Sequence, residues 1–128
     1  MNVLDENISV IQRQLLRSWR IPVRHIGHDA GRKGMTDDEV IPFLLSLRRP
    51  TFFTLDWDFH RPDLCHARYC LILLDVAREE SALFVRRVLA HPALDTQARR
   101  MGAVVRVSYA GLFVWRLNAR SEVHLEWA

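Results

Sequence analysis

Two aspartates stand one residue apart in the stretch TLDWDF (residues 54–59), directly after the aromatic run TFF (51–53). Carboxylates are costly to bury unless they are paired, hydrogen-bonded or bound to a metal. In an extended segment residues i and i+2 point the same way, so Asp56 and Asp58 could both reach one cation. They could equally close a turn, because aspartate favours turns.

Acidic side chains recur at two earlier points in the chain. Asp5 follows a short apolar segment, and a second acidic group consists of Asp37, Asp38 and Glu39. Carboxylate oxygens suit Mg²⁺ or Mn²⁺, and such ions in an acidic site promote phosphodiester hydrolysis. Each acid also has a simpler interpretation. Asp5 or Asn7 could cap the first helix, and the second group suits a helix N-terminus without any ligand.

The elements that must position these acids follow from hydrophobic spacing. The continuous apolar run 70–75 is typical of a strand that is buried on both faces of a parallel sheet. Pro42 is expected to kink the second helix or to shift its start. Strands are expected over 1–4, 21–26, 51–55, 70–75, 103–109, 112–117 and 123–127, and helices over 8–19, from 36 onwards and over 78–90.

This order of elements predicts an α/β fold. We expect three layers, with helices on both faces of a mainly parallel sheet that ends in a C-terminal hairpin. Functional sites in such folds lie at the carboxyl ends of the strands. Asp5 and the pair Asp56 and Asp58 follow predicted strands, so these acids are expected to meet at that edge.

Composition narrows the class of protein. The 128 residues fit one domain, 1–128, and a hydrophobic fraction of 49% argues against disorder. No apolar run reaches membrane-spanning length, no signal-peptide pattern begins the chain, and two cysteines do not make a disulfide framework. We therefore expect a cytoplasmic protein that does not enter a membrane.

Several motifs together resemble the PIN-like nuclease superfamily. The closest match is the compact uncharacterised bacterial PIN-like family often found in toxin–antitoxin loci. The pieces occur in the family's order and at its spacing, and cover roughly the first 80 to 90 residues. They are LDEN (4–7), HIGHDAG (25–31), TDDEV (36–40), TLDWDF (54–59) and ARYCLILLDV (67–76).

The resemblance implies a metal-dependent endoribonuclease, the toxin of a toxin–antitoxin pair, that binds Mg²⁺ or Mn²⁺ and is held by an antitoxin protein. Asp5 and Asp56 would be direct ligands, and Asp58 and Asp37 direct or water-mediated ones. Asp38 or Glu39 would replace Asp37 if the helix starts later. The site residues expected by position are Asp5, Asp37, Asp56 and Asp58.

Basic residues in the adjoining loops would meet RNA phosphates in this picture, namely Arg32, Lys33 and Arg61. The chain departs from the family at RRPTFF (48–53), where a more polar approach to the strand is usual. The hairpin VSYAGLFVWRL (107–117) has no counterpart that we can assign, and could contact a partner protein or a second copy.

Two other interpretations compete with a nuclease. In a non-catalytic binding module that engages a protein or RNA, Asp5 and Asp56 would accept backbone N–H groups and share no opening. A doubly wound phospho-acceptor domain also clusters acids around Mg²⁺, but it requires a lysine near the site. Lys33, the one lysine in the chain, lies in a glycine-rich loop and suits that role poorly.

Overall fold

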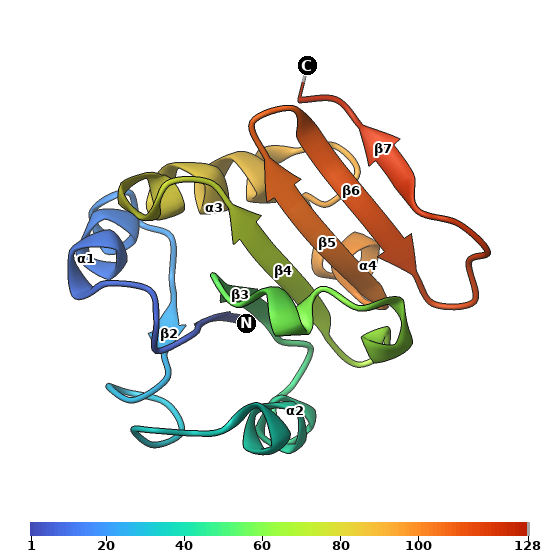
Figure 1. The fold of residues 1–128 in the computed structure, drawn as a ribbon. Helices are drawn as coiled ribbons and strands as arrows, with labels where there is room; N and C mark the ends of the chain where they lie inside the picture. The colour runs from blue at the N-terminus through green and yellow to red at the C-terminus, as the bar shows by residue number, and fades with distance from the viewer. Residues whose placement is uncertain (128) are drawn as a thin grey trace.

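A seven-stranded sheet runs through the protein in the order β2-β1-β3-β4-β5-β6-β7 (Figure 1). The computed structural model describes residues 1–127. Pairing is parallel from β2 to β5 and antiparallel from β5 to β7. The strands are β1 (Asn2–Leu4), β2 (Arg24–His25), β3 (Thr51–Thr54), β4 (Cys70–Asp75), β5 (Ala103–Ser108), β6 (Gly111–Arg116) and β7 (Val123–Leu125).

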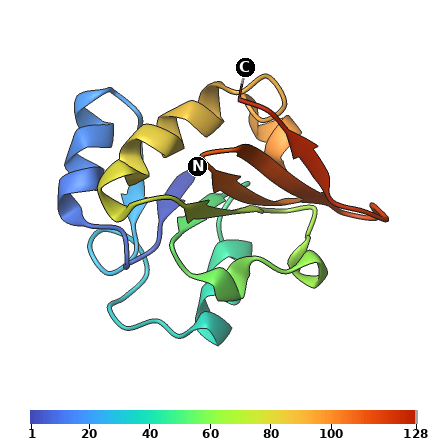
Figure 2. The same ribbon diagram turned by 45° about the horizontal axis from the view of Figure 1, so that its top comes forward.

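Helices cover both faces of this sheet (Figure 2). Helices α1 and α3 pack on one face and α2 packs on the other. The α helices are α1 (Val10–Ser18), α2 (Asp37–Leu45), α3 (Ser81–Ala90) and α4 (Gln97–Arg100), and the 3₁₀ helices are η1 (Trp57–Phe59), η2 (Pro62–Leu64) and η3 (Arg78–Glu80). The α/β class, the mainly parallel sheet and the C-terminal hairpin are therefore confirmed.

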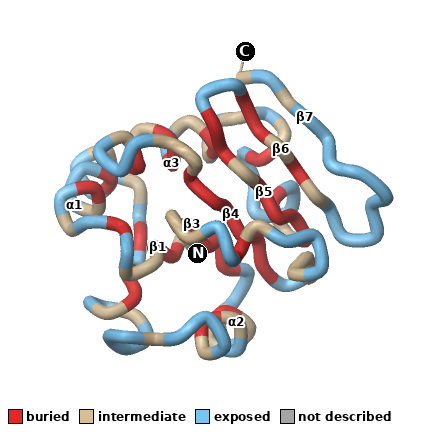
Figure 3. The backbone as a smooth tube through the Cα atoms, in the orientation of Figure 1, coloured by how far each residue is buried: buried red, intermediate tan, exposed pale blue. Residues whose placement is uncertain are grey.

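The alternation of side chains along the strands divides the core into two clusters. Phe53 packs with Leu16 of α1 and Val85 of α3, whereas Phe52 packs with Leu44 of α2. Successive strand residues point to opposite faces, so one strand supplies both clusters. The central strands are the most buried part of the chain, and β7 at the edge is largely exposed (Figure 3).

Some of the expected elements differ from the structure in their boundaries. The strand expected over 21–26 is reduced to the two residues of β2, since Pro22 has no N–H to donate and the chain turns after His25. The helix expected over 8–19 begins at Val10, and Ser9 rather than Asp5 or Asn7 caps it by accepting the N–H of Gln12. Helix α4 was not expected.

No helix within residues 1–127 has both the length and the apolar character needed to cross a membrane. Helix α2, expected from residue 36 onwards, begins at Asp37 after the N-cap residue Thr36, and it continues past Pro42 to Leu45. The identity of its first residue decides which acid lies nearest the carboxyl edge of the sheet.

Gly111 is required for the C-terminal hairpin to pair with β7. Its φ is +133°, and a Cβ at this position would lie 2.3 Å from the carbonyl oxygen of Leu125. Gly34 also has a positive φ, but a Cβ there would meet no atom within 4 Å. We expect Gly34→Ala to lower the free energy of unfolding by about 1 to 2 kcal/mol through backbone strain alone. Gly111→Ala should cost at least about 1 kcal/mol more.

Urea unfolding, monitored by circular dichroism, gives the free energy of unfolding of both variants. Equal stabilities for the two alanine variants would contradict the close approach of β7 to Gly111.

Candidate functional site

Three carboxylates meet at the carboxyl edge of the parallel strands. Asp37 is the first residue of α2, Asp56 precedes η1 and Asp58 lies within it. One oxygen from each of the three lies within 4.8 Å of the others, so together they could hold a metal ion. Asp37 and Asp58 are exposed and Asp56 is half-buried. We call these three residues the acidic triad.

Strand pairing brings one of the two contributing segments to this edge. Leu4 of β1 is in register with Phe53 of β3, and the N–H of Asp5 donates to the carbonyl of Phe53 at 2.8 Å. Both strands therefore end at the same level, and Asp56 and Asp58 follow the end of β3.

A capping box fixes the start of α2 and with it the position of Asp37. Glu39 accepts the N–H of Thr36 at 3.2 Å, which satisfies one of the unpaired donors at the start of the helix. Arg32 forms an ion pair with Glu39 from the preceding loop. Because α2 starts at Asp37, the later start that would have put Asp38 or Glu39 in its place does not occur.

Of the two conformations left open for residues 56–58, an extended segment and a turn, the structure has the turn. The chain turns into η1, and Asp56 accepts the N–H of Asp58 at 2.9 Å. Burial of Phe59 against Phe52 explains the turn, because it draws the chain back onto the core with the two rings edge to face at 5.2 Å. The turn still keeps Asp56 and Asp58 in one group.

Asp5 is not part of the acidic triad. One of its carboxylate oxygens accepts the N–H of Glu6 at 2.7 Å, and the other accepts the hydroxyl of Thr54 at 2.6 Å. The same hydroxyl oxygen accepts the N–H of Asp56 at 3.0 Å. Asp5 therefore lies behind the triad and is linked to it through Thr54, a residue that the sequence analysis did not identify.

Burial raises the pKa of Asp5 above its ordinary value. The hydrogen bonds from Thr54 and Glu6 oppose this effect, and the charges of Asp56 and Asp37 add to it. The hydrogen bonds from Thr54 and Glu6 therefore stabilise the ionised carboxylate, whereas its buried surroundings favour the neutral form. This balance makes the hydrogen bond from Thr54 important for the ionised state.

His25 supports the backbone beneath the site. Its side chain is fully buried, and its Nε2 lies 3.0 Å from the carbonyl oxygen of Asp5. Its ring stacks on His28 at 4.3 Å between centroids. Burial lowers the pKa of His25, so the imidazole is neutral and Nε2 donates its hydrogen to that carbonyl.

The acidic triad has no cationic partner among residues 1–127. Arg32 is paired with Glu39 and Arg61 with Asp63. Loss of hydration is the main cause that raises the pKa of Asp37, followed by the charges of Asp56 and Asp58. The three carboxylates therefore repel one another, and a bound divalent cation would relieve that repulsion.

Of the three basic residues expected to contact RNA, Arg61 shares a pocket with the triad, and Arg32 pairs with Glu39 on the first turn of α2. Arg61 lines a pocket of about 460 Å³ together with Asp37 and Asp58. Its ion pair with Asp63 is exposed and therefore weak enough to exchange for a phosphate. Lys33 forms no side-chain hydrogen bond or ion pair within the described part of the chain.

Comparisons with protein-family models, with curated proteins and with solved structures found no match. The choice between the competing interpretations therefore depends on the residues themselves. Asp5 and Asp56 each accept a backbone N–H, which the binding-module interpretation predicts. Asp37 and Asp58 line a common pocket, which is the arrangement that a nuclease requires.

The hydroxyl of Thr54 can be removed with little change of shape. We expect Thr54→Val to lower the free energy of unfolding by about 1 to 3 kcal/mol, because Asp5 then lacks a donor and the N–H of Asp56 lacks an acceptor. Thr54→Ser keeps the hydroxyl and is the matched control. Urea unfolding at neutral pH and below pH 3.8, the ordinary pKa of the carboxyl group, measures both variants. Thr54→Val should lower the free energy of unfolding more at neutral pH than at acid pH. A valine variant as stable as the serine variant would show that the hydroxyl does not link Asp5 to Asp56.

The raised pKa of Asp37 fixes the sign of a pH effect. The folded protein holds this proton more tightly than the unfolded chain, so stability falls as pH rises from 3.8 through the raised pKa. Asp37→Asn should therefore be more stable than wild type at neutral pH, by no more than about 1 kcal/mol because the group is exposed. The two proteins should be equally stable at acid pH.

Mn²⁺ should reverse this order at neutral pH, because it stabilises only the protein that keeps all three carboxylates. Asp38→Asn, on the same helical turn but outside the triad, is the control. Thermal unfolding with and without Mn²⁺ gives the comparison, and an unchanged order would count against a metal at this position.

Proposed function

We propose that this protein is a metal-dependent endoribonuclease with a PIN-like fold and the toxin of a toxin–antitoxin pair. The observation that carries the proposal is the acidic triad, in which two separate segments bring carboxylates to the carboxyl edge of a parallel sheet. That edge is where α/β folds place their functional sites. The family resemblance of the motifs around Asp5, Asp37 and Asp56 supports the same assignment.

The donor set suits a hard divalent cation. All three ligand groups are carboxylates, and the triad has room for water and substrate oxygens because two of its members are exposed. Asp37, Asp56 and Asp58 would hold the ion. A bound Mg²⁺ or Mn²⁺ would lower the pKa of a water molecule and stabilise the leaving oxygen of a phosphodiester.

Asp5 and Thr54 have a positioning role in this proposal. The Thr54 hydroxyl bonds both the Asp5 carboxylate and the Asp56 N–H, so it fixes the backbone that presents the Asp56 carboxylate. This assignment modifies the role that the family resemblance implies for Asp5. Its carboxylate acts through Thr54 rather than as a direct ligand.

Two side chains beside the triad fit an RNA substrate. Trp57 lies between Asp56 and Asp58 in the sequence and is 54% exposed, so its ring can stack against an unpaired base. Arg61 lines the adjoining pocket and offers a planar donor group to a phosphate. Both would orient a single-stranded segment across the metal.

An antitoxin would be expected to cover the same edge. The unpaired charges of the triad favour a partner segment that carries arginine or lysine, since such a side chain would take the place of the cation. The pocket of about 460 Å³ offers Ile41, Pro42 and Leu64 as apolar contacts for that segment.

The second candidate is a binding module without catalytic activity. The hydrogen bonds from backbone N–H groups to Asp5 and Asp56 favour it, because they give both acids a structural role. This candidate predicts that the triad binds no divalent ion and that RNA, if bound, is not cleaved.

Asp56→Asn separates the two candidates. Calorimetric titration of Mn²⁺ should show binding to wild type and at least about tenfold weaker binding to the variant. Cleavage of a single-stranded RNA should be lost with it, while circular dichroism shows both proteins folded. Asp95→Asn, which removes an exposed acid that is neither in the triad nor paired with Arg61, should behave as wild type.

Absence of Mn²⁺ binding to wild type, with RNA present, would exclude the nuclease and leave the binding module. Cleavage that survives in folded Asp56→Asn would place the chemistry elsewhere.

A further inference from the structure

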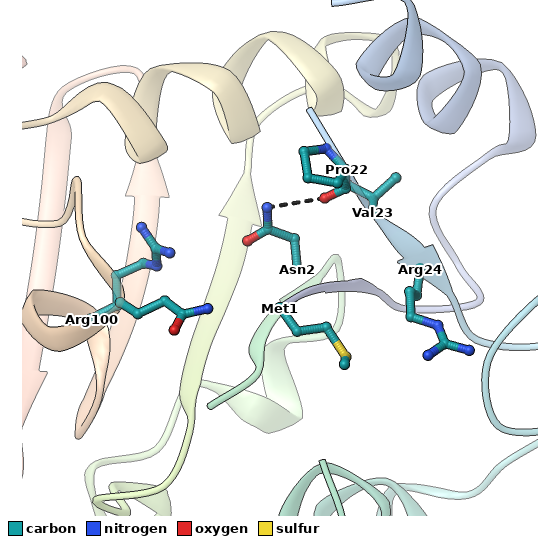
Figure 4. A pocket seen from close by; sticks show the side chains of 7 residues that line it. Met1, Asn2, Pro22, Val23, Arg24 and Arg100 are labelled. Atoms are coloured by element: carbon teal, nitrogen blue, oxygen red, sulfur yellow. Dashed lines mark hydrogen bonds between the residues drawn. The ribbon is translucent and has the colours of Figure 1, made fainter. Parts of the chain in front are cut away.

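Polar side chains anchor strand β1 at both of its ends. At the amino end Asn2 lies in a pocket of about 350 Å³ that Arg24 and Arg100 also line, and its side-chain amide donates to the carbonyl of Pro22 at 3.2 Å (Figure 4). At the carboxyl end the stretch DEN (5–7) follows directly. The side chains of this stretch reach both of the segments that carry the acidic triad.

Two members of this stretch hold the segment that leads to Asp56. The Asp5 carboxylate accepts the hydroxyl of Thr54, and the oxygen of that hydroxyl accepts the N–H of Asp56. The side-chain oxygen of Asn7 accepts the N–H of Leu55 at 3.4 Å, a longer and therefore weaker bond. The end of β1 is thus tied to the residues that directly precede the Asp56 side chain.

Glu6 reaches the other segment, which leads to Asp37. Its Oε1 accepts the N–H of Gly34 at 2.8 Å, three residues before Asp37. Within residues 1–127 no other side-chain hydrogen bond joins residues 5–7 to the loop before α2. The ion pair between Arg32 and Glu39 lies within that loop and helix, so it fixes their shape but not their distance from β1. The bond from Gly34 to Glu6 supplies that connection.

Gly27 leaves room for the Glu6 side chain on its way to Gly34. A Cβ at residue 27 would lie 2.7 Å from Oε2 and 3.0 Å from Cδ of Glu6, closer than real contacts allow. The chain turns at this glycine with a φ of +86°, and the Gly27 N–H donates to the carbonyl of Ala30 at 3.0 Å. The Glu6 carboxylate therefore lies against the turn after β2 and bonds the far end of the same loop.

We propose that Glu6 is a positioning residue that sets the separation of Asp37 from Asp56, an inference that rests on the proposed function of the triad as a metal site. The Asp5 carboxylate holds one segment and the Glu6 carboxylate holds the other. Two adjacent residues at the end of β1 therefore control the distance between ligands that come from separate parts of the chain. Mg²⁺ demands near-ideal octahedral geometry, so its affinity depends on that distance. Glu6 is not among the three acids whose oxygens converge, and its Oε1 is used by Gly34.

Calorimetric titration of Mn²⁺ into variants of Glu6 tests the proposal. Glu6→Ala removes the acceptor and should weaken Mn²⁺ binding by about tenfold to a hundredfold, the usual effect of losing a group that orients a metal ligand. Glu6→Gln keeps an oxygen that can accept the Gly34 N–H, so it should restore most of the affinity. Glu6→Asp keeps the charge but is one methylene shorter, so it should weaken binding as Glu6→Ala does. Glu79→Ala removes an exposed carboxylate outside both the stretch 5–7 and the triad, and should bind Mn²⁺ as wild type does.

The metal-free protein gives a second readout. In ¹H–¹⁵N correlation spectra Glu6→Ala should shift the amide signals of residues 34–38 and leave those of residues 55–58 close to their wild-type positions. Thr54→Val should do the reverse, because it releases the other segment. The Gly34 amide should exchange with solvent faster in Glu6→Ala than in wild type or Glu6→Gln, since it has lost its acceptor.

Circular dichroism checks that each variant is folded, and Glu6→Asp keeps the test decisive even if Glu6→Ala unfolds. Wild-type affinity in a folded Glu6→Ala or Glu6→Asp variant would overturn the positioning role alone and leave the metal site standing. Equal losses in Glu6→Gln and Glu6→Ala would also overturn it, because the charge rather than the acceptor would then matter. Unchanged amide signals at residues 34–38 in Glu6→Ala would refute the link from Glu6 to α2. A wild type that binds no Mn²⁺ would overturn the proposed function and this inference with it.

Discussion

The parallel pairing of β1 with β3 is the constraint on which the candidate site depends. It sets Leu4 beside Phe53 and continues through the bond from the Asp5 N–H to the Phe53 carbonyl. Because the two strands end at one level, the Thr54 hydroxyl can bond the Asp5 carboxylate and the Asp56 N–H at the same time. A shift of one residue in this register would turn Thr54 to the other face and separate the two acids.

Repulsion among its three carboxylates destabilises the acidic triad. Its three carboxylates lie close together without a cationic partner in the described chain, and burial and mutual repulsion both raise the pKa of Asp37. Local interactions must therefore hold each acid in place, namely the capping box at Thr36 for Asp37 and the 3₁₀ turn for Asp56 and Asp58. Carboxylates that are held close together despite their repulsion are typical of sites that bind cations.

The order of elements along the chain and the mainly parallel sheet were predictable from the sequence, whereas the contacts between distant side chains were not. Local signals predicted the strand Cys70–Asp75, the hairpin around Gly111 and a helix that opens near residue 36. The turn at Asp56 depends on where Phe59 finds space in the core, which is a tertiary effect. The role of Thr54 depends on a neighbour 49 positions away in the chain, and no local pattern reports that contact.

The two ends of the sheet carry opposite charge, and this polarity affects how a polyanion would approach. Asp37, Asp56 and Asp58 lie at the carboxyl edge, while Arg24 and Arg100 lie at the amino edge. The local charge therefore differs between these two edges of the sheet, within a net charge of +3. Encounter at the acidic edge would then depend on both ionic strength and divalent-ion concentration.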